Sequence, residues 1–162
     1  MKIIFLLLSL LIAGSIIALF ILGLMSKYGK APGLIDNNLS PCAKKPNCVC
    51  SEHTYKKDLK HYIAPIIIPK HISHEALANS KKIIIEMGGY IQVENDHYIS
   101  STFSSSIFGF VDDFEIRFAQ DTNALHLRSA SRVGHSDRGV NKKRIKLFKK
   151  HLSEKSFDIK LK

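Results

Sequence analysis

The stretch "FGFVDDFEIRFAQDTNALHLRSASRV", residues 108–133, decides the fold because apolar and polar side chains alternate along both of its halves. Alternation with a period of two is typical of a strand with one buried face. The apolar face of the first half consists of Phe110, Phe114, Ile116 and Phe118. In the second half, Leu125 and Leu127 are separated by the polar His126, and a turn-rich segment, 119–124, lies between the halves. The sequence therefore predicts an antiparallel hairpin.

The register of this hairpin also follows from the pattern. Pairing Phe118 with Leu125 places both apolar faces on one side of the sheet. The further pairs predicted by this register are Ile116 with Leu127, Phe114 with Ser129, Asp112 with Ser131, and Glu115 with Arg128. The last pair joins opposite charges on the other face, which contributes roughly 0.2–1 kcal/mol. The apolar faces and the charge pair thus favour the same register.

A helix is predicted after the hairpin, over residues 137–152, with Ser136 or Asp137 as its cap. Its apolar face consists of Ile145, Phe148 and Leu152, and its opposite face of Lys142, Lys143, Lys146, Lys149 and Lys150. Asn141 and Arg144 fall on the apolar face at 100° per residue. A guanidinium taken out of water needs a carboxylate or several acceptors, so Arg144 should have a buried partner.

The remaining segments complete the expected fold. Residues 61–69 read as an edge strand because Pro65 interrupts them, and 73–87 as a helix capped by Ser73 and ended by Gly88-Gly89. Residues 90–94 and 97–103 flank an Asn95-Asp96 turn and predict a second hairpin. We therefore expect an α+β fold, with an antiparallel sheet of four to five strands and two helices packed on one face.

The N-terminus predicts a transmembrane helix in front of this domain. Residues Ile3 to Met25 form an uncharged, almost wholly apolar run of 23 residues, and roughly 20 suffice to cross a bilayer. A cleaved signal peptide is the alternative, but its apolar region is usually shorter, about 7–15 residues. The expected organisation is an anchor at 1–26, a linker with a cysteine loop at 27–54, a globular domain at 55–152 and a basic tail at 153–162.

The three cysteines, Cys42, Cys48 and Cys50, all lie in the short loop "PCAKKPNCVCSE". Clustered cysteines bounded by prolines favour a disulfide in an oxidising compartment. The sequence leaves open which two bond, and Cys42 with Cys48 is our first candidate pair. Reduced thiols remain an alternative. A metal site is another, although the three thiols with His53 match no standard zinc pattern, and we expect neither metal nor cofactor.

Two signals disagree about which side of the membrane holds the domain. The lysines that follow the apolar run, Lys27 and Lys30, favour the cytoplasmic side. The short N-terminal tail and the cysteine loop favour export. We predict a single-pass protein of the inner (cytoplasmic) membrane with its domain on the exported side.

The net charge of +10 is concentrated near the C-terminus. From Lys142 to Lys162 there are nine Lys or Arg residues against Glu154 and Asp158, a net of +7. Clustered cations attract anionic lipid, a small anionic ligand or an acidic protein partner. A nucleic-acid role is disfavoured, because no recognition motif is present and a membrane anchor precedes the domain.

Three segments, "PCAKKPNCVCSE", "FGFVDDFEIRF" and "LRSASRVGHSDRGVNKKRI", resemble a membrane-associated bacterial and plastid family catalogued as domain of unknown function 1499. The resemblance covers roughly residues 40–150, and it implies no established activity, substrate or cofactor. This chain departs from the family pattern at Cys50, where serine is common. The segment "FSSSIFGF" also lacks an arginine that members often carry.

The segment 127–145 allows a structural and a functional interpretation. In the structural one, Asp112 accepts hydrogen bonds from Arg144 or from the serines, and Asn141 ties down the turn backbone. In the functional one, arginines and the amides at the helix start hold a phosphate or carboxylate. The candidate ligand-binding residues are Arg128, Ser129, Ser131, Arg132, Ser136, Asp137, Arg138, Asn141 and Arg144.

Catalysis is the alternative class, with Asp112 and Asp113 beside serines and His126 or His135. Adjacent strand residues point to opposite faces, so the two carboxylates cannot easily act as a pair. The nucleophile elbow, the P-loop and the zinc-protease motif are absent from the sequence. The sequence therefore favours a non-catalytic envelope protein that binds an anionic ligand, a lipid head group or an envelope partner, over a hydrolase-like enzyme centred on Asp112 or Asp113.

Overall fold

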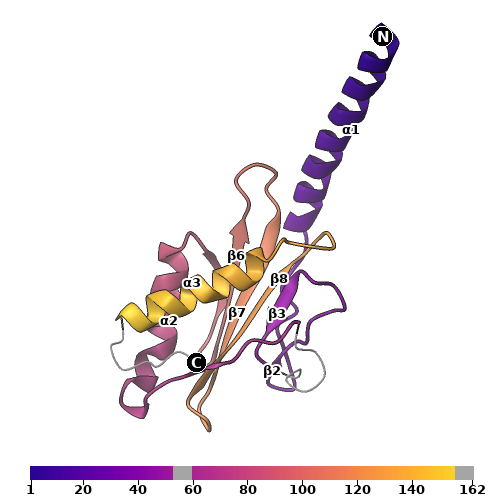
Figure 1. Ribbon diagram of the computed structural model, residues 1–162. Coiled ribbons are helices and arrows are strands. Elements are labelled where there is room, and N and C mark those ends of the chain that lie inside the picture. The colour runs from indigo at the N-terminus through magenta and orange to yellow at the C-terminus, as the bar shows by residue number, and fades with distance from the viewer. Residues whose placement is uncertain (53–59, 156–162) are drawn as a thin grey trace.

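The computed structural model describes residues 1–52 and 60–155 (Figure 1). Over these residues the helices are α1 (Lys2–Lys27), η1 (Lys70–Glu75), α2 (Ala76–Glu86) and α3 (Val140–Lys155). The strands are β1 (Leu34–Ile35), β2 (Asn38–Leu39), β3 (Cys48–Cys50), β4 (Ile66–Ile67), β5 (Tyr90–Glu94), β6 (Tyr98–Ser104), β7 (Val111–Ala119) and β8 (Ala124–Ser131). The fold is α+β, as predicted.

The main sheet of the described residues has six antiparallel strands, so the prediction of four to five was wrong. Five strands follow the order β3-β8-β7-β6-β5, and β4 also pairs with β8. Both β3 and β4 use the outer edge of β8: Cys48 to Cys50 pair with residues 128–130, and Ile66 and Ile67 with Leu125 and Ala124. Segments as short as β3 and β4 carry too few residues to show a strand period.

The central hairpin has the predicted register. Phe118 pairs with Leu125, and the four further predicted pairs, from Asp112–Ser131 to Ile116–Leu127, are all present between β7 and β8. The second hairpin is also confirmed, with β5 and β6 antiparallel and a turn closed by a 2.9 Å hydrogen bond from Asn95 N to Tyr98 O. The apolar alternation therefore specified both the strands and their alignment.

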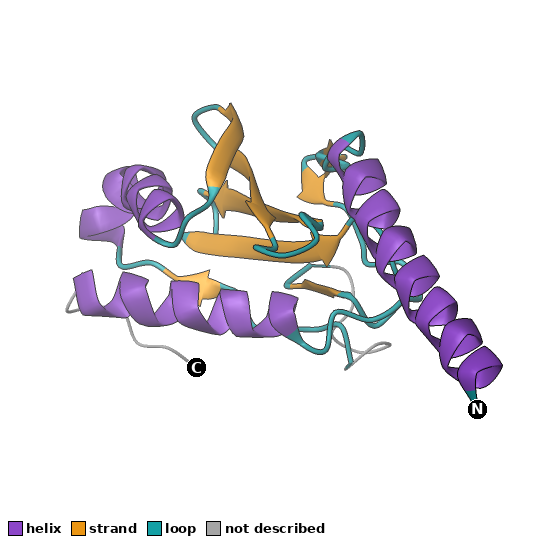
Figure 2. Ribbon diagram, turned by 90° about the horizontal axis from the view of Figure 1, so that it is seen from above, coloured by secondary structure: helices purple, strands orange, loops and turns teal. Residues whose placement is uncertain are grey.

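One face of the sheet forms the hydrophobic core together with residues of the helices. Phe114 contacts Phe148 of α3 with ring centroids 5.2 Å apart. The same buried cluster contains Ile83 and Ile84 of α2, and Ile145 and Leu152 of α3. Figures 1 and 2 show α3 lying over one face of the sheet and crossing its long strands at an angle.

The helix starts differ from the sequence expectation. Ser73 does not cap α2, because its Oγ donates to Lys70 O within η1, and α2 begins at Ala76. Asp137 does act at the start of α3, accepting from the backbone N of Gly139 at 2.9 Å and of Asn141 at 2.7 Å. Gly88, at φ +84°, follows α2 in a conformation that favours glycine.

The lysine face of α3 is exposed except at Lys149. Its Nζ donates to Ala64 O at 2.6 Å, and burial lowers its pKa from the ordinary value. Lys149 therefore ties α3 to the segment before β4, which the sequence pattern did not indicate.

The opposite face of the sheet is covered by the segment expected to be a linker. Strands β1 to β3 lie in this segment, and Leu39, Cys50 and Tyr98 form a second buried cluster. Helix α1 projects beyond the domain from one end of the sheet (Figures 1 and 2). Among the helices of the described residues, α1 alone is both long enough and apolar enough to cross a membrane.

Candidate functional site at the end of helix α1

The C-terminal part of helix α1 is joined to the domain by close contacts. The Oγ of Ser26 donates to Gly23 O at 2.6 Å and accepts from the backbone N of Val111 at 2.9 Å. The Phe20 ring meets the Phe108 ring edge-on, with centroids 5.1 Å apart. A Cβ at Gly23 would lie 1.8 Å from Phe108 O, so glycine is required for this approach. The helix is thus docked on the loop before β7.

Arg132 strengthens the same junction. Its Nη2 and Nε donate to the carboxylate of Asp113, at 2.7 and 3.0 Å. Its Nη1 donates to Ser26 O at 3.2 Å and Lys27 O at 3.5 Å. These carbonyls belong to the last turn of α1, where backbone acceptors lack helical partners and the helix dipole favours a cation. Arg132 therefore connects β8, β7 and α1.

A second buried ion pair lies next along this face. Glu115 is fully buried and accepts from Arg128 Nη1 at 2.6 Å, from the Tyr98 hydroxyl at 2.6 Å and from Gly33 N at 3.2 Å. Burial and the carboxylate of Glu115 raise the pKa of Tyr98, so the hydroxyl stays a donor. The predicted Glu115–Arg128 pair is confirmed, and it ties the covering segment to the sheet.

The third ionic contact of this face involves Glu52. Its carboxylate pairs with Arg117 and accepts from Leu39 N at 2.5 Å. His126 Nδ1 lies 3.5 Å from the same carboxylate and 3.2 Å from Ser51 Oγ. Burial lowers the pKa of His126, against the opposing effect of Glu52. The three ionic contacts form a charged layer between the sheet and the covering segment.

The core face of the sheet carries a separate polar network. Arg144 Nη2 donates to Asp112 at 2.8 Å, which confirms the buried partner expected for Arg144. Arg144 Nη1 donates to Ser129 Oγ at 3.0 Å and Asn141 Oδ1 at 2.6 Å. The Nδ2 of Asn141 donates to Asn47 O at 2.9 Å. Asn141 thus ties down the cysteine loop, where the sequence had suggested the turn backbone.

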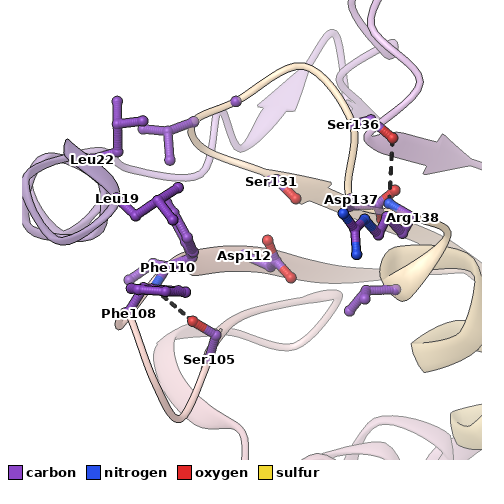
Figure 3. A pocket seen from close by; sticks show the side chains of 14 residues that line it. Leu19, Leu22, Ser105, Phe108, Phe110, Asp112, Ser131, Ser136, Asp137 and Arg138 are labelled. Atoms are coloured by element: carbon purple, nitrogen blue, oxygen red, sulfur yellow. Dashed lines mark hydrogen bonds between the residues drawn. The ribbon is translucent and has the colours of Figure 1, made fainter. Parts of the chain in front are cut away.

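A cavity of about 500 Å³ lies between helix α1 and two loops, and we call it the loop cavity (Figure 3). Leu19 and Leu22 of α1 line one wall, next to Phe108 and Phe110 of the loop between β6 and β7. The polar side chains that line it are Ser105, Asp112, Ser131, Ser136, Asp137 and Arg138. Figure 3 shows the Arg138 side chain directed into the cavity. The loop cavity combines an apolar wall with a polar end.

A second cavity, of about 560 Å³, lies where the chain leaves α1, and we call it the basic cavity. Lys27, Lys30 and Arg132 line it together with Tyr28, Tyr98 and Ser100. None of the described residues that line it is acidic. Because Asp113 balances the charge of Arg132, the uncompensated positive charge comes from the two lysines. The basic cavity is therefore suited to an anion.

The candidate ligand-binding residues are not brought together in one place. Ser131, Ser136, Asp137 and Arg138 line the loop cavity, and Arg132 lines the basic cavity. The other candidates are held in the two networks described above: Arg128, Ser129, Asn141 and Arg144. Most of their donors serve the scaffold, as the structural interpretation of the sequence expected for Arg144. Among the described residues, Arg128 Nε is buried without a hydrogen-bond partner.

The two aspartates of the hydrolase-like alternative lie in different surroundings. Asp112 pairs with Arg144 on the core face, and Asp113 pairs with Arg132 on the opposite face. The expectation that these carboxylates point apart is confirmed. Within the described residues there is also no group of three or more His, Cys, Asp or Glu side chains placed to hold a metal ion. His53, considered as a metal ligand, lies outside the described residues.

The cysteine loop contains a disulfide between the candidate pair, Cys42 and Cys48. Cys50 is a free, fully buried thiol, and burial raises its pKa to about 11. The thiolate is the reactive form, so Cys50 should be unreactive in the folded protein.

Sequence reasoning missed Gly23 and Ser26, which join α1 to the domain. A glycine and a serine three residues apart share one side of a helix and could have signalled a contact. Gly14, Ser9 and Ser15 lie in the same apolar run, and this signal alone does not separate them from the contact pair. The lysines of the basic cavity were noticed only for their effect on membrane orientation.

Comparison with known proteins agrees with the resemblance found in the sequence. The chain matches, over residues 38–152, the family described as "Protein of unknown function (DUF1499)". The search of curated proteins and the search of solved structures gave no match. The family match includes the cysteine loop, all strands of the main sheet, and most of α3. This chain therefore belongs to the DUF1499 family of proteins of unknown function.

Proposed function

We propose that this protein is a single-pass membrane protein whose domain binds the head group of an anionic lipid in the basic cavity, without catalysing a reaction. The observation that carries the proposal is the placement of Lys27 and Lys30 in a cavity without acidic lining residues among those described. The position directly after an apolar helix supports the same conclusion, because lipid head groups are the nearest anions there.

If α1 spans the membrane, the basic cavity lies at the level of the lipid head groups. The apolar run of α1 ends at Met25, and Lys27 is two residues further on, about 3 Å along the helix. The polar layer of a bilayer extends several ångströms beyond its hydrocarbon core. Each lysine near an anionic membrane surface contributes about 1 kcal/mol of attraction. Tyr28, which lines the cavity, is of the residue type enriched at membrane interfaces.

Arg132 has a supporting role in this proposal. Its hydrogen bonds to Asp113 and to the last carbonyls of α1 hold the wall of the cavity in place. The ligand is then held mainly by lysine ammonium groups, which interact as point charges, so we expect weak discrimination between anionic head groups. Binding should weaken as salt rises, because exposed charges are screened.

The experiment is lipid retention by the full chain purified in mild detergent and supplied with phosphatidylglycerol or phosphatidylcholine. Native mass spectrometry counts the lipids bound to the wild type, to Lys27→Gln/Lys30→Gln and to Lys44→Gln/Lys45→Gln. The second variant is the matched control, because it removes the same charge from exposed lysines of the cysteine loop. We expect phosphatidylglycerol to be retained by the wild type and the control and lost from Lys27→Gln/Lys30→Gln.

Equal retention by all three proteins would contradict a site in the basic cavity. Equal loss from both double variants would show that total charge, and not the cavity, governs retention. A wild type that retains neither lipid would also contradict the proposal, and an envelope protein partner would then become the leading ligand class.

We further propose that the domain lies on the exported side of the inner membrane, as part of the cell envelope. The disulfide between Cys42 and Cys48 supports this side, because such bonds persist in oxidising compartments. The test is a C-terminal fusion to a reporter enzyme that is active only outside the cytoplasm. An inactive reporter with an intact fusion protein would place the domain in the cytoplasm, as Lys27 and Lys30 would favour.

A further inference from the structure

We infer that the loop of residues 105–110, between β6 and β7, inserts into the lipid bilayer beside α1 and gives the domain a second contact with the hydrocarbon layer. The inference rests on the proposed membrane-spanning role of α1, and it is independent of which side holds the domain. The partner surface is the acyl-chain region of the bilayer.

The position of the loop along α1 fixes its depth. The Phe108 ring contacts the Phe20 ring at 5.1 Å, and Phe108 O lies against Gly23. Phe20 precedes Met25, the end of the apolar run, by five residues, or about 7.5 Å of helix. If α1 crosses the bilayer, the side chain of Phe108 lies below the level at which the apolar run ends. Its natural surroundings on the side away from α1 are then acyl chains.

The composition of the loop suits that depth. The segment "SSIFGF", residues 105–110, contains no charged residue, and three of its six side chains are large and apolar. Ile107 is 71% exposed at the loop, and the rings of Phe108 and Phe110 lie 5.9 Å apart. An exposed isoleucine next to two packed phenylalanines has no protein surface to cover it within the described part of the chain.

Three internal hydrogen bonds satisfy part of the backbone of the loop, which lowers the cost of entering an apolar environment, where every unpaired N–H or C=O is costly. Ser105 N donates to Phe110 O at 2.8 Å, and Gly109 N donates to Ser105 O at 3.1 Å. Phe110 N donates to Ser105 Oγ at 3.0 Å. Gly109, at φ +68°, makes the turn that closes these bonds. The two ends of the loop are therefore joined by internal hydrogen bonds.

Insertion also explains the apolar wall of the loop cavity. Leu19, Leu22, Phe108 and Phe110 would face the hydrocarbon layer, and the polar end with Arg138 and Ser136 would lie towards the head groups (Figure 3). The cavity would then open on the edge of the membrane and not into bulk water.

The chain contains no tryptophan, so one introduced tryptophan reports its surroundings without background. We would compare three full-length variants reconstituted in phosphatidylcholine vesicles with brominated acyl chains: Ile107→Trp, Leu10→Trp and Ile67→Trp. Leu10 lies within α1, and Ile67, 57% exposed on β4, pairs with Ala124 at the opposite end of the sheet from this loop. Bromine quenches only tryptophans that reach the acyl chains.

We expect Leu10→Trp and Ile107→Trp to be quenched with blue-shifted emission, and Ile67→Trp to be quenched several-fold less. Quenching of Leu10→Trp but not of Ile107→Trp would overturn the inference and leave the spanning helix intact. An unquenched Leu10→Trp would overturn both. Loss of lipid retention in the lysine variants tests only the basic cavity, so the two proposals fail separately.

Discussion

Ser26 near the end of helix α1 accepts a 2.9 Å hydrogen bond from the backbone N–H of Val111, the first residue of β7. The same hydroxyl donates to Gly23 O, so both hydrogen-bonding roles of this buried serine are filled. Together with Arg132, which donates to the carbonyl of Ser26, this bond makes the end of the apolar helix part of the domain. The direction of the helix is consequently coupled to the sheet.

Replacing Gly23 should separate the loop of residues 105–110 from helix α1. In Gly23→Ala the new Cβ would lie 1.8 Å from Phe108 O, a backbone atom that cannot move without the loop. We expect faster hydrogen exchange in the peptide spanning 105–111, because the Val111 N–H loses Ser26 as its acceptor. The measurement is hydrogen–deuterium exchange with mass spectrometry on the full chain in nanodiscs.

Gly14→Ala is the matched control for this change. Gly14 lies in the same helix, and apart from the adjoining residues and backbone of that helix, none of the described atoms comes within 4 Å of the position of its added Cβ. Its exchange should equal that of the wild type. Unchanged exchange in Gly23→Ala would show that the helix and the loop are not in contact in the membrane.

The Asp112–Arg144 pair should be a major contributor to stability. In Arg144→Met the aliphatic stem is partly kept, but the guanidinium that lies over the Phe103 ring is lost and Asp112 is left unpaired at a largely buried position. Removing one partner of a buried pair costs about 3–5 kcal/mol, because the remaining charge stays out of water. We expect a loss of this size in the free energy of unfolding, measured by urea denaturation in detergent.

Two comparisons define the origin of that loss. Adding Asp112→Asn to Arg144→Met should recover part of it, because the unpaired charge is then gone. Lys81→Met breaks the ion pair between Lys81 and Glu94, which is exposed because the two side chains are 40% and 42% accessible. This variant should lose less than about 1 kcal/mol of the free energy of unfolding. A loss in Arg144→Met as small as that in Lys81→Met would show that the buried pair is dispensable.

The sequence could predict contacts between residues that lie close together along the chain. The β7–β8 register followed from alternation, because Phe118 and Leu125 are close in sequence and must share a face. Arg144 was correctly expected to need a carboxylate, since its helical position put it among apolar residues. Both arguments use local periodicity together with the cost of burying a charge.

Contacts that join distant segments were beyond such arguments. Strand β3 has three residues, and its place beside β8 depends on an edge that β4 leaves free. Glu52 meets Arg117 across 65 positions of sequence. The basic cavity forms only because the end of α1 docks next to Arg132. In each case, the position of one segment is set by tertiary packing and not by its own pattern.

The cysteines should differ sharply in reactivity. Burial raises the pKa of Cys50 to about 11, so almost no thiolate exists at neutral pH, and the thiol is also inaccessible. We expect a thiol-reactive mass tag to leave the folded protein unmodified at pH 7. After unfolding without reductant it should add one tag, at Cys50, because Cys42 and Cys48 are bonded to each other.

Reduction before tagging should raise the number of tags from one to three. Three tags on unfolded protein that had never met a reductant would contradict the disulfide. One tag on the folded protein at pH 7 would contradict the burial of Cys50. The two results are independent, so the pairing and the environment of the free thiol are tested separately.

His126 should make the fold sensitive to mild acid. Burial lowers the pKa of its imidazole below the ordinary value of 6.5, and Glu52 compensates only in part. The unfolded chain then takes up a proton at a pH where the folded protein still resists it. The contribution of neutral His126 to the free energy of unfolding is therefore complete above the ordinary pKa of 6.5. It is lost as the pH falls from that value through the lower pKa of the folded protein.

The measurement is the free energy of unfolding of the wild type and of His126→Gln from about pH 8 to about pH 5.5. Glutamine keeps a polar group beside Ser51 Oγ but does not titrate. We expect the wild type to lose more stability than the variant over this range, while effects of the shared carboxylates cancel in the difference. A wild type that loses less stability than His126→Gln would mean that attraction to Glu52, 3.5 Å away, outweighs the cost of burial.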